Sequence, residues 1–150
     1  MMTKFEGAGR SRTATADGAA YGWQRSTVVW QALSVLSLLA MGGIHLYLVL
    51  TGVGGVLGVL FALNAVGALV LAIAIGIFRR TPLLVVVDGL SLLFMLGTLL
   101  ALVLALTSGL FGIRETLDGQ LVPTTLVVEP IGTIVLLVTT GLMLRLRRYT

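Results

Sequence analysis

Four apolar stretches constrain this chain more than any other feature of its sequence. They run over residues 27–50, 55–78, 83–106 and 124–144. An α-helix rises about 1.5 Å per residue, so about 20 apolar residues cross the roughly 30 Å hydrocarbon layer of a bilayer. The sequence therefore predicts an all-α protein, built as a bundle of four transmembrane helices in a lipid bilayer.

The composition supports a membrane class over a soluble domain with a large core. Of the 150 residues, 57% are hydrophobic and 11% are charged, whereas soluble domains carry about 25% charged residues. Residues 1–26 are rich in Gly, Ala, Ser and Thr, and we expect them to form a flexible cytoplasmic tail. Residues 27–148 then form one transmembrane domain, with no room for a separate catalytic domain.

The basic residues predict how the four spans are oriented. An up-down-up-down arrangement places nine of the ten lysines and arginines on one side, and Arg114 on the other. Basic residues accumulate on the cytoplasmic side, which predicts the cytoplasmic (inner) membrane with both termini in the cytoplasm. The net charge of +4 is thus explained without a nucleic-acid partner. The nine are Lys4, Arg10, Arg12, Arg25, Arg79, Arg80, Arg145, Arg147 and Arg148.

Several kinds of chemistry have no support in the sequence. The chain contains no cysteine, which excludes disulfides and thiolate metal sites and weakly favours a bacterial origin. It has no nucleophile elbow, HExxH motif or P-loop, so we expect no enzymatic activity. The sequence identifies no cofactor, and its single histidine leaves a metal site unknown, because a metal normally needs three or four protein ligands.

Ionisable and polar residues within the spans fall into two layers. A charged residue in mid-membrane costs at least ~2.5–3.5 kcal/mol, which makes such residues functional candidates. His45 and Glu129 each lie about five residues from the outer end of a span, roughly 8 Å deep at helical rise. Asp88 and Gln31 form an inner polar layer, and Asn64 is expected between the layers, near mid-membrane.

The outer layer has two interpretations. In the first, His45, Asn64 and Glu129 form a ligand or proton site, over which Glu115 or Asp118 closes. In the second, a hydrogen bond between His45 and Glu129 only fixes the packing of the first and last spans.

Two other groups of residues have simpler structural interpretations. Asp88 is a neutral acid, or an acid hydrogen-bonded to Gln31 or Ser91, or part of a conduction path for protons or cations. Gly54 and Gly58 form a GxxxG pair, which predicts close packing between spans.

Three short motifs carry a resemblance to known sequences. They are HLYLVL at 45–50, LFALN at 60–64 and GLFGIRE at 109–115, followed by the acidic Glu129 in the last span. With them the chain resembles an uncharacterised family of small four-span actinobacterial membrane proteins. The resemblance covers most of the spans and implies no activity. It includes His45, Asn64, Glu115 and Glu129.

These observations lead to one main prediction of function and two alternatives. We expect a non-catalytic accessory or assembly subunit of a cytoplasmic-membrane complex, with a membrane-protein partner or further copies of itself. The first alternative is a small transporter or ligand-binding protein whose outward-facing His/Glu/Asn site takes a cation, a proton or a lipid-like molecule. The second is an enzyme acting on lipid or quinone, with His45 as base. A water-reachable cavity beside His45 favours the alternatives, and a dry His45–Glu129 contact favours the accessory role.

Overall fold

The structure confirms an all-helical bundle for the part of the chain that it describes. This computed structural model describes residues 6–79, 81–109, 112 and 114–147, and for 6–25 it describes the backbone alone. The described residues form four helices and no strand. All four are long and apolar enough to cross a membrane. The helices are α1 (Glu6–Leu50), α2 (Gly55–Phe78), α3 (Leu84–Thr107) and α4 (Val122–Arg147).

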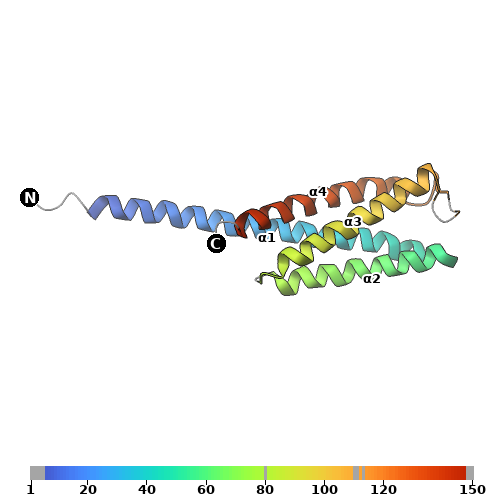
Figure 1. Cartoon of the computed structure of the whole chain (residues 1–150), viewed down its shortest axis with the longest axis horizontal. Helices are drawn as coiled ribbons and strands as arrows, with labels where there is room; N and C mark the ends of the chain where they lie inside the picture. The colour runs from blue at the N-terminus through green and yellow to red at the C-terminus, as the bar shows by residue number, and fades with distance from the viewer. Residues whose placement is uncertain (1–5, 80, 110–111, 113, 148–150) are drawn as a thin grey trace, which may run out of the picture.

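The candidate membrane spans agree closely with the apolar stretches of the sequence. They cover Ser26–Leu50 of α1 and the whole of the other three helices, so each begins and ends within three residues of its predicted position. Helix α1 begins at Glu6, so its backbone continues without a break through the predicted domain boundary near residue 26. Figure 1 shows this N-terminal part of α1 extending beyond the bundle. The flexibility of residues 1–26 stays a prediction.

A glycine turn sets the short connection between α1 and α2. Gly52 has a φ of +103°, a conformation that glycine adopts at little cost. Its N–H donates to the carbonyl oxygen of Val49, and the N–H of Val53 donates to that of Leu48, at 3.2 and 3.1 Å. This pair of bonds is a Schellman motif, which satisfies the last carbonyls of the helix. It therefore ends α1 sharply and lets α2 begin at Gly55.

The connections place two loops together at one end of the bundle. In Figure 1 the α1–α2 turn and the α3–α4 connection lie at the same end, and the α2–α3 connection lies at the other. Helix α1 packs against α2 and α4, and α3 packs against α4. The α2–α3 pair packs less extensively than these three pairs.

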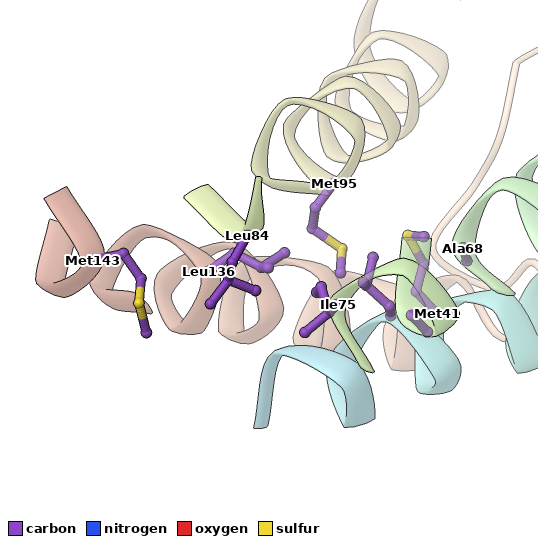
Figure 2. Packing of buried hydrophobic residues seen from close by; sticks show 9 residues of the cluster. Met41, Ala68, Ile75, Leu84, Met95, Leu136 and Met143 are labelled. Carbon is purple, nitrogen blue, oxygen red and sulfur yellow. The ribbon is translucent and has the colours of Figure 1, made fainter. Parts of the chain in front are cut away.

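The core is a line of apolar side chains drawn from all four helices. Figure 2 shows Met41 of α1, Met95 of α3 and Leu136 of α4 within this cluster, and all three are fully buried. Large apolar side chains also cover the outside of the spans, as Leu63 and Leu93 do with 63% and 67% of their surface exposed. Such a surface suits hydrocarbon, since apolar residues gain nothing by leaving lipid for protein.

Small residues let the spans approach closely, at positions other than the predicted GxxxG pair. A methyl group added at Gly42 of α1 would lie 2.9 Å from Cβ of Ala68 on α2. Gly54, by contrast, is exposed just before α2, and an added methyl group would meet the Gly52 oxygen at 3.9 Å. At Gly58 it would meet the carbonyl of Val53 in the preceding turn. In this chain, therefore, the pair shapes the turn, and the close α1–α2 contact lies at Gly42 and Ala68.

Candidate functional site

A cavity of about 650 Å³ lies between the helices, at the end of the bundle that holds the α1–α2 turn and the α3–α4 connection. Its wall is mostly apolar. All four residues of the predicted outer site, His45, Asn64, Glu115 and Glu129, line it. The structure thus brings together side chains from α1, α2, α4 and the α3–α4 connection. Their binding of a ligand stays a prediction.

Both ring nitrogens of His45 are engaged. Nδ1 lies 2.9 Å from the carbonyl oxygen of Met41, one helical turn earlier, and Nε2 lies 3.2 Å from Nδ2 of Asn64. A carbonyl oxygen can only accept, so Nδ1 carries the proton and Nε2 accepts from the Asn64 amide. The ring of Phe61 meets the imidazole edge-on, with the centroids 5.0 Å apart. Together these contacts hold a neutral imidazole in a fixed orientation.

This geometry contradicts one interpretation of the outer layer, the hydrogen bond between His45 and Glu129. The structure shows no hydrogen bond between His45 and Glu129 in the described residues. Asn64 occupies the second ring nitrogen of His45, and neither Glu129 oxygen makes a hydrogen bond. Asn64 was expected deeper than His45 but in the same site, and its side chain reaches the imidazole.

The cavity wall contains buried polar atoms that make no hydrogen bond in the described residues. Glu129 has no exposed surface, and neither of its carboxylate oxygens makes a hydrogen bond in the described residues. The hydroxyl of Thr98 lies close to the carboxylate but donates to the Met95 carbonyl oxygen, at 2.8 Å. Oδ1 of Asn64 is likewise buried without a hydrogen bond. Leaving such a group unsatisfied costs about 1–3 kcal/mol, and more when it is charged. Since all three of these atoms accept hydrogen bonds when the carboxyl is ionised, the site is suited to a ligand that brings donors.

The α3–α4 connection contributes Glu115 and Gln120 to the lining of the cavity. The N–H of Glu115 donates to the carbonyl oxygen of Ala105 at the end of α3, at 3.1 Å, which anchors this half-buried residue over the site. Gln120 also lines the cavity, whereas Asp118 is exposed outside the lining. Leu110, Phe111 and Ile113, in the motif GLFGIRE, lie outside the described residues.

Sequence reasoning missed the residues that make the space itself. Gly97, Ala101 and Ala105 follow one another at intervals of four on α3, and all three line the cavity. The spacing puts them on one helix face, so the signal was available. A stripe of small residues, however, predicts close packing as readily as an open space. Thr125 is a further lining residue that the sequence did not single out. Thr98 also lines the cavity, and its spacing from Asp88 and Ser91 had placed it on the polar face of the third span.

The inner polar layer forms a separate cluster at the other side of the core. The hydroxyl of Thr140 donates to Oδ2 of Asp88, at 2.7 Å, and Asp88 is fully buried with Oδ1 unpartnered. This corrects the expected Asp88 partners, because Ser91 donates instead to the Val87 carbonyl and no described contact joins Asp88 to Gln31, which is half-buried. The cluster ties α3 to α4.

In the described ranges no three His, Cys, Asp or Glu side chains gather closely enough to hold a metal. Comparison with protein-family models, with curated proteins and with solved structures finds no match for this chain.

Proposed function

We propose that this is an integral membrane protein that binds a small, largely apolar molecule in the cavity at the outer end of the bundle. The observation that carries the proposal is the convergence of His45, Asn64, Glu115 and Glu129 on one apolar space of about 650 Å³. Ligand sites are typically mostly apolar cavities of roughly 300–1,000 Å³ with a few convergent polar groups.

The state of the polar groups supports binding over a purely structural role. A structural pair makes at least one direct hydrogen bond, as Thr140 does to Oδ2 of Asp88, although Oδ1 of that residue has no partner. At the outer site His45 is satisfied, but Glu129 lines the cavity with a buried carboxylate that makes no hydrogen bond in the described residues, although the Thr98 hydroxyl lies close to it. We therefore assign His45 and Asn64 to shaping the wall, and the Glu129 carboxylate to meeting the ligand.

The proposal includes an orientation in the membrane. The chain spans the cytoplasmic membrane of a bacterium in an up-down-up-down arrangement, and both termini lie in the cytoplasm. The unequal distribution of basic residues supports this orientation. The cavity then opens in the outer half of the bilayer. The resemblance to small four-span actinobacterial proteins stays a prediction, as does the absence of enzymatic activity.

The test is to identify what the protein retains on purification. The full chain is extracted in mild detergent and examined by native mass spectrometry, beside Glu129→Gln and His45→Ala. We expect one small molecule per chain on the wild-type protein, and reduced occupancy in both variants. Asp88→Asn, in the inner layer, is the matched control and keeps the ligand. Folded wild-type protein that carries and binds no small molecule would contradict the proposal.

The accessory-subunit role stays a prediction that the same experiment examines. A protein partner at fixed stoichiometry, with an empty cavity, would favour that role over ligand binding. A ligand with no protein partner would favour the proposal made here.

A further inference from the structure

We infer that the ligand is a cationic amphiphile, a molecule with an ammonium head and a hydrocarbon chain, which enters from the bilayer between α2 and α3. This inference rests on the proposed function and names its ligand class. Two independent features support it: the charge of the cavity wall and the side on which the cavity is open.

The charged side chains in the wall are all acidic. Among the described residues that line the cavity these are Glu115 and Glu129, and no lysine or arginine is among them. Glu129 is completely buried, and its carboxylate makes no hydrogen bond in the described residues, with the Thr98 hydroxyl close to it. A buried carboxylate persists at low cost only when a cation or several hydrogen-bond donors meet it. An ammonium head supplies both the charge and the donors.

The neutral members of the wall favour the same head group. His45 uses Nδ1 as a donor to Met41 and Nε2 as an acceptor from Asn64, which leaves no ring N–H for an anion. Oδ1 of Asn64 is a further unpartnered acceptor. The polar end of the cavity therefore offers mainly acceptors, and an anionic head would meet repulsion at Glu115 and Glu129.

The apolar part of the cavity is open toward lipid. Leu60 and Leu63 of α2 and Leu93 of α3 line the cavity and are also 39%, 63% and 67% exposed. All three lie within candidate membrane spans, so their exposed surface faces hydrocarbon. The α2–α3 pair is also less tightly packed than its neighbours. We name this opening, bordered by Leu60, Leu63, Leu93 and the exposed Gly97, the lateral portal.

The acidic residues and the lateral portal lie at different depths in the membrane, and this separation fits one amphiphile with a polar head and a hydrocarbon chain. Glu129 is seven residues into α4 and Glu115 is in the connection before that helix, so the acidic groups lie in the outer part of the layer. Leu93 is nine residues into α3 from the opposite end, or about 14 Å at helical rise, which places it near mid-membrane. A chain passing from Glu129 to the portal therefore points toward the bilayer centre, as lipid chains do.

The head group is tested by photo-crosslinking in proteoliposomes. The full-length protein is exposed to hexadecylamine, hexadecanol and hexadecanoic acid, each with a diazirine in the chain, and the labelled residues are mapped by mass spectrometry. We expect the amine to label the lateral portal several-fold more than the acid does. Glu129→Gln reduces amine labelling to the level of the alcohol, whereas Asp88→Asn leaves it unchanged.

The proposed entry of the ligand between α2 and α3 is tested with variants of two glycines on α3. A methyl group added at Gly97 or at Gly89 meets no atom within 4 Å, so both sites accept a larger side chain. Gly97 borders the portal and Gly89 is outside the cavity lining. We expect Gly97→Leu to lower amine labelling at least several-fold, and Gly89→Leu to leave it unchanged.

The outcomes separate this inference from the proposed function. Equal labelling of the portal by all three probes overturns the cationic head while cavity binding stands. Unchanged labelling in Gly97→Leu, with Gly89→Leu as reference, overturns the lateral route. Portal labelling no stronger than that of Val127 and Ile131, which are exposed on α4 outside the cavity lining, overturns both this inference and the proposed function.

Discussion

Asn64 on α2 holds His45 on α1 through a contact of 3.2 Å between Nδ2 and Nε2. Because Nδ1 of the same ring donates to the Met41 carbonyl, the imidazole has both nitrogens satisfied before any ligand arrives. The histidine therefore forms part of the wall of the site, whereas the buried Glu129 carboxylate makes no hydrogen bond in the described residues.

The Asn64–His45 contact predicts a measurable coupling between α1 and α2. Replacing His45 by Phe and Asn64 by Leu, singly and together, forms a double-mutant cycle on the free energy of unfolding in detergent. Hydrogen bonds between membrane helices average about 0.6 kcal/mol by this method, with a maximum of about 1.7 kcal/mol. We expect a coupling energy in this range.

A second cycle between His45 and Glu129 is the control. These residues share the cavity without a hydrogen bond in the described structure, so their coupling should be near zero. A larger coupling for His45–Glu129 than for His45–Asn64 would show that the two residues pair directly and that the site is assembled differently.

Most of the fold could be predicted because lipid leaves a chain few choices. A span must satisfy its backbone hydrogen bonds internally, so a long apolar stretch such as 55–78 becomes a helix with nearly the same bounds. The connection between the first two stretches is short and contains Gly52 and Gly54, which is typical of a tight turn. The continuation of α1 back to Glu6 was not predicted, since a composition rich in Gly, Ser and Thr favours disorder in isolation.

The sequence could predict how deep the site residues lie along their helices, but not how each helix is rotated about its axis. Counting residues from the span ends placed His45 and Glu129 at one level, and both line the same cavity. Rotation about each helix axis depends on packing between distant residues, such as Gly42 against Ala68. That rotation, together with the reach of the Asn64 side chain, decides that the imidazole meets an amide and that the carboxylate is left without a hydrogen bond.

The hydrogen bond from Thr140 to Asp88 predicts unequal effects for two threonines of α4. Thr140→Val removes the donor, 2.7 Å from Oδ2, and leaves a buried carboxylate oxygen unsatisfied. We expect a loss of about 1–3 kcal/mol in the free energy of unfolding. The hydroxyl of Thr133 is buried without a partner, so Thr133→Val should be neutral or stabilising. Thermal unfolding in detergent measures both, and a greater loss in Thr133→Val would contradict this assignment.

The close approach of α1 and α2 predicts an equally sharp contrast between adjacent glycines. A methyl group at Gly42 would lie 2.9 Å from Cβ of Ala68, while one at Gly43 meets nothing within 4 Å. Overpacking costs about 1–3 kcal/mol, so Gly42→Ala should destabilise the bundle. Gly43→Ala should be stabilising by up to about 1 kcal/mol, because alanine is the better helix former. Ala68→Gly should restore the stability of Gly42→Ala, and failure of this rescue would place the contact elsewhere.

The proposed orientation predicts which loops a membrane-impermeant maleimide can reach. The chain has no cysteine, so each variant carries a single thiol. Thr116 and Thr81 are exposed in the α3–α4 and α2–α3 connections, which lie at opposite ends of the bundle. In intact cells without an outer-membrane barrier, we expect Thr116→Cys to react at once and Thr81→Cys to react only after permeabilisation.

A buried position supplies the reference for this measurement. Ser91 has no exposed surface, so Ser91→Cys should stay unlabelled in both conditions unless the protein unfolds. The reverse pattern, with Thr81→Cys reactive from outside, would place the termini and the basic residues outside the cell. The cavity would then face the inner half of the bilayer, and an amphiphile would have to reach the lateral portal from the cytoplasmic leaflet.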